Sequence, residues 1–264
     1  MLNKKSFKYI YTGFYDSYKI CLKKNNFLFY HHNIYENKQK KIIDKVSKNI
    51  LSKKLIEPFY KQHTQYLINA ISINKKDKIN ILDIGGGWGV GYANCIEAFN
   101  KKKLLNLNYH IYDLKNVCAI GEKFFKKRLR LKKNLKYYDN LEQLESTKYD
   151  IIFLGSSLQY FSDPFKILKK IIKLNSPLII FIDTYLTDTK TFFTKQKYYD
   201  VGVPHSFINK KEFLLSFKNK YRLESITNSH TTRLGKIGEI NMSNFKRIYR
   251  IKNSFNLIFK KNAK

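Results

Sequence analysis

The sequence has few cysteines and prolines, and its histidines lack the spacing of a metal site. These absences argue against several classes of protein. Among 264 residues only Cys21, Cys95 and Cys118 are cysteines, and their wide spacing gives neither a disulfide framework nor a C-x-x-C metal motif. The six histidines also lack the spacing of a metal site. With four prolines there is no proline-rich linker. We therefore expect no disulfide scaffold and no bound metal.

Long hydrophobic runs are missing as well. No run reaches the ~20 residues needed to cross a bilayer, and the longest, PLIIFI at 177–182, has the length of a buried strand. Polar and charged residues interrupt the basic N-terminus, so we expect no secretory signal. Together with cysteines that form no disulfide pattern, this favours a cytoplasmic protein.

Acidic residues are few against basic ones. Lys and Arg total 51 and Asp and Glu total 20, which gives a net charge of +31. One interpretation is a surface that attracts nucleic acid or an anionic membrane. The other is compositional drift, because Lys, Asn, Ile, Phe and Tyr are all abundant, all have A/T-rich codons, and the lysines form no dense tract. The charge establishes no partner, although so basic a chain will adhere to polyanions in low salt.

The first 76 residues are rich in aromatics and have helical periodicity. Apolar residues recur at helical spacing in 35–53, and 58–72 opens with Pro58 and gathers its apolar residues near one face. We expect helices in both segments. We also expect an N-terminal helical lid or substrate segment, 1–76, ahead of a ligand-binding domain, 77–264.

From residue 79 the pattern changes to strands that alternate with helices. The expected strands are 79–84, 108–114, 135–139, 149–155 and 177–183, and the expected helices are 92–103, 115–130, 140–146 and 163–174. A polar loop after 183, a helix at 209–219 and two late strands at 221–228 and 254–260 follow, the strands as an antiparallel pair at the sheet edge. Such alternation is typical of an α/β Rossmann-like fold, with a mostly parallel seven-stranded sheet and helices on both faces.

A glycine-rich turn follows the first of these strands, in ILDIGGGWG at 81–89. Such a loop at the carboxyl end of a parallel strand lets the backbone approach a ligand, and the helix that follows favours negatively charged groups. The dinucleotide fingerprint does not fit, because no frame of these glycines has a small residue at the sixth position of the motif. The P-loop does not fit either, because no Gly-Lys-Ser/Thr follows the glycines. A purely structural glycine turn is the alternative.

What remains resembles the first motif of class I S-adenosylmethionine-dependent methyltransferases. Asp83 ends the strand, and the expected cofactor-binding residues of the loop are Gly85, Gly86, Gly87, Trp88 and Gly89. The second strand ends in Asp113 and Leu114, where an acid can accept hydrogen bonds from both ribose hydroxyls; a solvated strand-end acid is the alternative.

The fourth strand runs into GSSLQYFSDPFKIL at 155–168. Asp163 and Pro164 are typical of a helix N-cap followed by a first-turn proline. We expect Ser156, Ser157, Gln159 and Tyr160 to face cofactor and substrate. The Asn/Asp-Pro-Pro-aromatic sequence usual in nucleic-acid amino-methyltransferases is absent, which counts against a base-methylating enzyme.

These segments resemble one narrower group, the methyltransferase family of surface-polysaccharide (O-antigen and capsule) gene clusters. The resemblance runs over roughly 8–225 and is carried by YTGFYDSYKI at 11–20, the glycine loop, 155–168, and IIFIDTYLT with VPHSFINKKEFLLSF at 179–217. Two positions depart from it: Thr184 stands where an Arg is expected, and Ser206 where an aromatic is expected. Both lie on the acceptor side.

The resemblance implies S-adenosylmethionine as cofactor and O-methylation of a sugar or another small molecule in surface glycan assembly. Transfer to a hydroxyl requires alignment and a base, and the catalytic candidates are Asp183, His205 and Tyr160, with Asp183 first by position. A lipid-linked acceptor would let the positive charge hold the protein at the inner face of an anionic membrane. The alternatives are an RNA methyltransferase and a non-catalytic basic nucleic-acid-binding module; nucleic acid is the less favoured partner.

Overall fold

A computed structural model describes most of the chain. The described residues are 9–24, 63–125, 134–198, 201–230, 239–263 and the positions 37, 41, 44, 48, 232, 233, 236 and 237. The helix expected at 35–53 lies almost entirely outside them, as do the ends of those expected at 58–72 and 115–130. Within the described part, no helix has the length and apolar character to span a bilayer.

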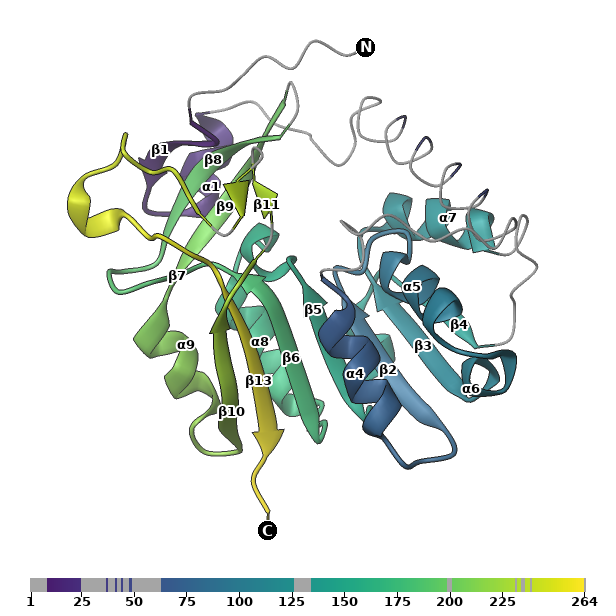
Figure 1. The fold of residues 1–264 in the computed structure, drawn as a ribbon. Coiled ribbons are helices and arrows are strands. Elements are labelled where there is room, and N and C mark those ends of the chain that lie inside the picture. Colours follow the sequence, from purple (N-terminus) through teal and green to yellow (C-terminus); the bar gives the residue numbers. More distant parts are fainter. Residues whose placement is uncertain are drawn as a thin grey trace.

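A seven-stranded sheet forms the centre of the molecule (Figure 1). The first five strands of this sheet in chain order are parallel to one another, and its last strand runs antiparallel to both of its neighbours. In spatial order the strands are β10 (Tyr221–Asn228), β13 (Phe255–Lys261), β6 (Leu178–Thr184), β5 (Ile151–Gly155), β2 (Ile79–Ile84), β3 (Leu107–Tyr112) and β4 (Leu135–Tyr138). Because the chain order reverses at β2, the crevice beyond its carboxyl end is the expected ligand site of such a sheet.

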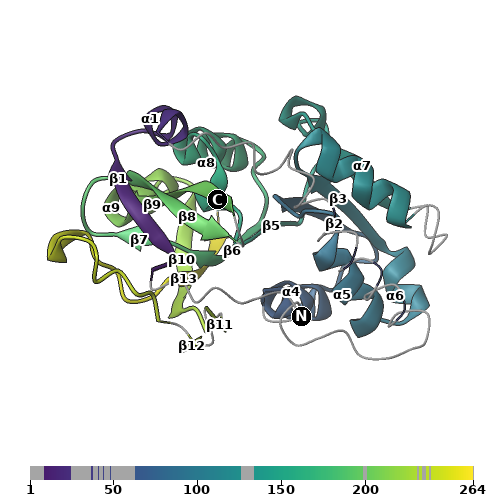
Figure 2. The same ribbon diagram turned by 90° about the horizontal axis from the view of Figure 1, so that it is seen from above.

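Helices cover both faces of this sheet, because its inner strands are apolar on both sides. Consecutive residues of β2 belong to different cores: Ile81 packs with α4 (Gln65–Ile73) and α5 (Val90–Ala98), and Leu82 with α8 (Pro164–Lys173) and α9 (Lys210–Phe217). Figure 2 shows α4 and α5 on the opposite side of the sheet from α8. The helices are α4 (Gln65–Ile73), α5 (Val90–Ala98), α6 (Lys101–Leu105), α7 (Lys115–Lys123), α8 (Pro164–Lys173) and α9 (Lys210–Phe217).

The strand boundaries expected for the main sheet are confirmed to within two residues, and the two late strands pair antiparallel as expected. The single helix expected at 92–103 is wrong. It is divided into α5 and α6, because the Asn100 side chain accepts a hydrogen bond from the Lys103 amide (2.9 Å) and starts a second helix. The helix expected at 140–146 is a short 3₁₀ turn, η3 (Leu141–Leu144).

A second, smaller sheet stands beyond the carboxyl edge of the main one (Figure 1). Its strands, in spatial order, are β1 (Tyr11–Tyr15), β8 (Phe192–Tyr198), β9 (Val201–Asn209) and β7 (Leu186–Thr187); we call this sheet the cap. The polar loop expected after 183 is therefore wrong, and so is a helical assignment for 11–15. A short helix, α1 (Tyr18–Lys23), follows β1.

Aromatic side chains pack across the strands of the cap, and a buried hydroxyl in it is hydrogen-bonded. Phe192 and Phe207 stack across β8 and β9 at 4.9 Å, and the Thr194 hydroxyl, which is fully buried, donates to the Thr12 carbonyl (3.0 Å). Residues 194–197 are four consecutive polar residues, which favour a loop in the sequence, but the segment is a strand because it pairs with both β1 and β9.

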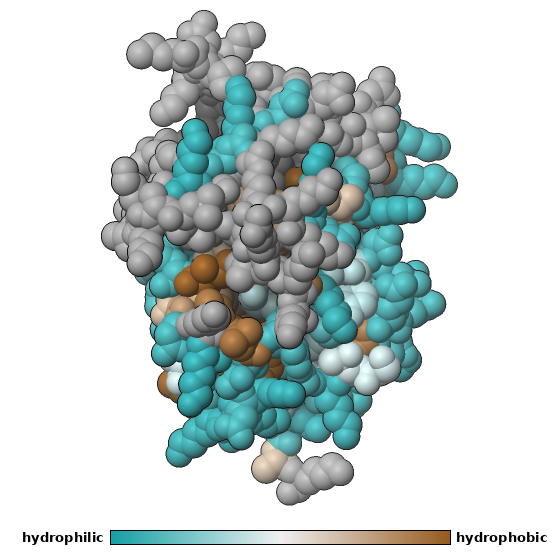
Figure 3. All heavy atoms as spheres, turned by 90° about the vertical axis from the view of Figure 1, so that its right-hand side faces the viewer, coloured by the Kyte–Doolittle hydropathy of each residue, from teal (hydrophilic) through white to brown (hydrophobic). Residues whose placement is uncertain are grey.

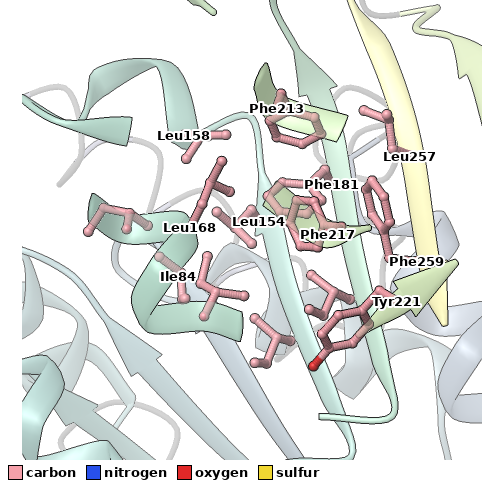
Figure 4. Packing of buried hydrophobic residues seen from close by; sticks show 14 of the residues in the cluster. Ile84, Leu154, Leu158, Leu168, Phe181, Phe213, Phe217, Tyr221, Leu257 and Phe259 are labelled. Atoms are coloured by element: carbon pink, nitrogen blue, oxygen red, sulfur yellow. The ribbon is translucent and has the colours of Figure 1, made fainter. Parts of the chain in front are cut away.

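Aromatic side chains fill the core on the α8–α9 side (Figure 4). Tyr221 packs there against Phe217 at 5.9 Å, and its hydroxyl is buried with no hydrogen-bond partner among the described residues. A buried polar group without a partner costs about 1–3 kcal/mol. We expect Tyr221→Phe to raise the free energy of unfolding by up to about 1 kcal/mol, measured by urea denaturation. A loss of stability would show that the hydroxyl has a partner.

Candidate functional site

The glycine loop begins where β2 ends and closes tightly on itself. Gly85, Gly87 and Gly89 have φ of +70°, +61° and +107°, in the left-handed region that favours glycine. The Gly89 amide donates to the Gly86 carbonyl (3.1 Å), and the Gly85 amide to the Tyr112 carbonyl at the end of β3 (2.7 Å). The loop is therefore attached to both β2 and β3.

Asp113, just beyond β3, fixes the centre of this loop. Its Oδ2 accepts a hydrogen bond from the Gly87 amide (2.8 Å), and its Oδ1 accepts one from the Leu114 amide (2.7 Å). Burial raises the pKa of Asp113, the hydrogen bonds from the two amides partly offset this effect, and the resulting pKa is about 6. A Cβ built on Gly87 would meet no atom within 4 Å. The structure thus places a carboxylate, a glycine backbone and open space side by side.

Asp83 lies beneath the loop, on the side of α5, and only 2% of it is exposed. Its Oδ2 accepts a hydrogen bond from the Tyr109 hydroxyl (2.7 Å). Burial raises the pKa of Asp83 to about 7, against the lowering effect of that hydrogen bond and with a smaller raising effect from the charge of Asp113. Asp83 thus supports the loop from within the protein.

This buried acid makes the stability depend on pH. The pKa of the Asp83 carboxyl is about 7 in the folded chain and 3.8 in an unfolded chain. At pH values between these two, the folded state therefore binds the proton more tightly than the unfolded state does. The free energy of unfolding should therefore fall as pH rises through this window, by about 1.4 kcal/mol for each unit of pKa difference. We expect Asp83→Asn to flatten that fall, measured by urea unfolding from pH 4 to pH 8. Parallel pH curves for both proteins would contradict the assignment.

Two other residues expected at the cofactor contribute differently. The Trp88 ring is 3% exposed, meets the Phe124 ring edge-on (5.4 Å) and lies parallel to that of Phe125 (6.3 Å); it packs in the core. Leu114 is exposed and precedes α7, with its amide bonded to Asp113. Their local sequence could not show which way either side chain points.

The turn after β5 is joined to the glycine loop. Ser157 donates its hydroxyl proton to the Ile84 carbonyl (2.6 Å), and Ser156 has a φ of +58°. A three-residue 3₁₀ turn, η4 (Leu158–Tyr160), follows. Asp163 is the N-cap of α8, as expected, since its Oδ1 accepts from the Lys166 amide (2.9 Å).

Asp183 lies near the end of β6, and the carboxylate is fully engaged. Oδ2 accepts from the hydroxyls of Ser156 (2.8 Å) and Tyr185 (3.5 Å), and Oδ1 accepts from that of Ser254. The Asp183 amide donates to Asn256 Oδ1 (3.0 Å). One buried acid thus links β5, β6 and β13. Sequence reasoning missed Tyr185, Ser254 and Asn256, and no local pattern marks them.

The other two catalytic candidates lie in the cap and beside it. His205 is fully buried on β9; its ring is perpendicular to that of Tyr185 (4.3 Å) and to that of Tyr160 (5.6 Å). Tyr160 donates its hydroxyl proton to Gln196 Oε1 (2.9 Å), and burial raises its pKa. Because Tyr185 contacts both Asp183 and His205, the three candidates form one cluster between the main sheet and the cap.

Gln159 is the last of the expected site residues, and it is buried on η4 with 2% exposed. Its Nε2 donates to the carbonyl (2.9 Å) and hydroxyl (3.0 Å) oxygens of Ser156. Its main-chain carbonyl accepts a hydrogen bond from the Ser206 hydroxyl of β9 (3.2 Å). Gln159 thus connects the turn after β5 with the cap. Within the described residues no group of three or more His, Cys, Asp or Glu side chains could hold a metal ion.

Comparison with known proteins identifies the fold. No protein-family model and no curated protein matches the chain. Among solved structures, it is similar to an amino pentose methyltransferase from Micromonospora echinaspora involved in calicheamicin biosynthesis, solved with S-adenosylmethionine bound: TM-score 0.51, 7% identity, 88% of this chain and 98% of that one covered.

Two further solved structures are similar to lesser degrees. One is an S-adenosylmethionine-dependent methyltransferase from Clostridium acetobutylicum ATCC 824, with a TM-score of 0.48, 16% identity, and 85% of this chain and 98% of that one covered. The other is the magnesium protoporphyrin IX methyltransferase from Synechocystis PCC 6803, with a TM-score of 0.48, 11% identity, and 77% and 80% covered. The likeness to the amino pentose methyltransferase, at 7% identity, shows the fold alone.

Proposed function

We propose that this protein is an S-adenosylmethionine-dependent methyltransferase. The observation that carries the proposal is the hydrogen bond from the Gly87 amide to Asp113 Oδ2 (2.8 Å) at the point where the strand order reverses. It holds a carboxylate next to a bare stretch of backbone in the place where such sheets bind nucleotides.

The residues present fit this cofactor. Each oxygen of Asp113 uses one lone pair on an amide, so capacity remains to accept from two ribose hydroxyls. The space beside Gly87 admits a ligand where any side chain would intrude. In our proposal the backbone of 85–89 and the turn at Ser156 and Ser157 complete the cofactor site. When bound, S-adenosylmethionine supplies a methyl group on a cationic sulfur.

The protein's own task is then to align an acceptor and remove its proton. We assign the general base to Asp183, which lies at the carboxyl edge of the sheet, with His205 as the second candidate. Tyr160 has a raised pKa and stays protonated at neutral pH, so it serves as a hydrogen-bond donor. A base role for Asp183 requires that an acceptor displace one of its three hydroxyl partners.

We propose a sugar hydroxyl, or that of another small molecule in surface glycan assembly, as the acceptor. The resemblance of 155–168 and 179–217 to methyltransferases of polysaccharide gene clusters supports this choice. The cap would form the acceptor wall, with the N-terminal segment 1–76 as its lid; β1 already contributes to that cap. Thr184 and Ser206, which depart from the family pattern, are both buried near this wall, so the acceptor can differ from those of the family.

The charge of +31 favours a second candidate, RNA methylation, or a basic module that binds nucleic acid without catalysis. Among the coloured residues of the face drawn in Figure 3, hydrophilic ones predominate beside smaller hydrophobic patches. The same charge would hold a cytoplasmic enzyme at an anionic membrane if the acceptor is lipid-linked.

Incubation with methyl-labelled S-adenosylmethionine tests these alternatives. The protein is mixed with separate pools of nucleotide sugars, lipid-linked glycans and RNA, and the labelled pool is identified. Label in a glycan pool supports the proposal. Absence of cofactor binding in calorimetry, together with RNA binding that weakens steeply with salt, would establish the binding module instead.

A further inference from the structure

Lysines gather at the amino edge of the main sheet, where its parallel strands and β10 begin and where β13 ends. Figure 1 shows the C-terminus at this same lower edge. The residues that lead into β2, β3, β5, β6 and β10 include lysine in every case, and so does the end of β13. In chain order these lysines are Lys75, Lys76, Lys78, Lys102, Lys103, Lys148, Lys173, Lys218, Lys220, Lys260 and Lys261.

The turns at the opposite edge of the sheet have the other sign of charge. Those that follow β2, β3, β4 and β5 contain Asp113, Asp139 and Asp163 but no lysine or arginine. Basic residues recur only beyond these turns, in the cap and at 246–252. Compositional drift toward lysine would enrich the connections at both edges alike. The asymmetry therefore indicates that the amino edge has a negatively charged partner.

Ion pairs neutralise only part of the charge at the amino edge. The pairs are Lys76 with Asp150 (2.5 Å), Lys173 with Glu145 (2.7 Å) and Lys260 with Glu224 (3.0 Å). Most of the other lysines at this edge are exposed and have no ion pair within the described ranges, among them Lys75, Lys78, Lys148 and Lys220. Their charges are available to a partner outside the protein.

Two aliphatic side chains project from the same edge. Ile73, the last residue of α4, is 80% exposed, and Leu105, the last residue of α6, is 55% exposed. The Lys103 ammonium group donates to the Asn74 carbonyl (3.4 Å), which connects the ends of these two helices. Exposed aliphatic groups beside lysines are the combination with which protein surfaces bind an anionic membrane.

Nucleic acid fits this surface less well. Proteins that hold single strands stack the bases on aromatic side chains, and the large hydrophobic residues exposed in the described part of the chain are all isoleucine or leucine. Ile73 and Leu105 would also add nothing to contacts with phosphate groups, whereas in a bilayer they would leave water for the boundary of the acyl chains. The observations favour a lipid surface.

We infer that the amino edge of the main sheet docks on an anionic lipid bilayer, with its lysines against the headgroups and with Ile73 and Leu105 in the interfacial region. This docking does not depend on the proposed function. It turns the proposed cofactor site away from the bilayer by the length of β2, six residues or about 20 Å. A soluble acceptor reaches that site directly, whereas a lipid-linked acceptor needs a glycan that spans this distance.

Vesicle flotation with the full chain tests the docking. The wild-type protein should bind phosphatidylcholine vesicles that contain about one third phosphatidylglycerol and should bind phosphatidylcholine alone much more weakly. Each lysine near such a surface contributes about fivefold, so Lys75→Glu combined with Lys78→Glu should lower the affinity for anionic vesicles at least about tenfold.

The matched control is Lys166→Glu combined with Lys211→Glu, which makes the same change in net charge. Both lysines are exposed in the first turns of α8 and α9, and these helices run toward the amino edge, so both positions lie away from it. The control should lower the affinity by less than about threefold. Equal losses in the two double variants, or wild-type protein that does not bind anionic vesicles, would overturn the inference.

A tryptophan at Ile73 reports insertion directly. The fluorescence of Ile73→Trp should shift to shorter wavelength on anionic vesicles and be quenched by brominated lipid. Ile248→Trp should show neither change, because Ile248 is 65% exposed on η5 (Arg247–Tyr249), which packs on the cap through Tyr249 and Phe192. Trp88 is buried and gives both variants the same background.

Two further outcomes are decisive. An Ile73→Trp signal that does not respond to vesicles would overturn the inference. So would binding to RNA, but not to vesicles, that is lost in the variant with Lys75→Glu and Lys78→Glu, since the amino edge would then be a nucleic-acid surface. Failure of the wild-type protein to bind S-adenosylmethionine would refute the proposed function and leave the docking surface as inferred.

Discussion

Replacing Asp113 by alanine should weaken S-adenosylmethionine binding by about 10- to 100-fold, equivalent to ~1–3 kcal/mol of lost hydrogen bonds. Two losses combine. The variant has no carboxylate for the ribose hydroxyls, and the Gly87 amide loses the oxygen that holds the loop in place (2.8 Å). In the proposed site the carboxylate would bind the ribose, and it already supports the backbone beside it.

Calorimetry on three proteins checks this result. Asp113→Asn retains one oxygen for an amide and should fall between wild type and alanine. Asp139→Ala is the matched control, because Asp139 follows the neighbouring strand β4 and is exposed. If Asp113→Ala binds the cofactor within about twofold of wild type, Asp113 does not bind the ribose. The main support for the proposed cofactor site would then be lost.

The pH profile of binding gives an independent check on the same residue. The pKa of Asp113 is raised to about 6 by burial, so its anion forms only as pH rises through this value. Binding that depends on this anion should strengthen between pH 5 and pH 7, and the Asn variant should lack the dependence.

The sequence was sufficient for the parallel sheet because burial on both faces leaves a strong signal. The runs 151–154 and 178–182 are wholly apolar and are followed by a glycine and an acid, so the sequence itself marks these strands and their ends. Asp163 is similarly local, because its capping partner Lys166 is three residues away. Features set within a few residues were predictable.

The cap and the environment of Asp183 were not predictable, because they depend on distant partners. The strand β8 has four consecutive polar residues at 194–197, and one of its two partners is β1, nearly two hundred residues earlier in the chain. Asp183 meets Ser254, 71 residues away. His205 lies in the segment expected to be a polar loop, yet it is fully buried. The sequence does not show the aromatic rings that surround it.

Alanine at Gly86 should mainly reduce the stability of the protein, whereas alanine at Gly87 should mainly reduce its affinity for the cofactor. A Cβ on Gly86 would lie 2.6 Å from Asp83 Cγ and 2.7 Å from its Oδ2, against a carboxylate already held by Tyr109. Such overpacking costs about 1–3 kcal/mol, occasionally more. A Cβ on Gly87 meets no atom within 4 Å, so its cost is the positive φ of +61°, about 1–2 kcal/mol.

We therefore expect Gly86→Ala to lose more stability, about 3 kcal/mol in urea unfolding, and Gly87→Ala to lose only about 1 kcal/mol. In calorimetry the order should reverse: the Gly87 methyl group enters the proposed cofactor space and should reduce S-adenosylmethionine affinity at least about tenfold in protein that remains folded. If Gly87→Ala binds like wild type, the space beside Gly87 is not where the cofactor lies. If Gly86→Ala is as stable as wild type, Asp83 is free to move, and its role as a fixed support beneath the loop is wrong.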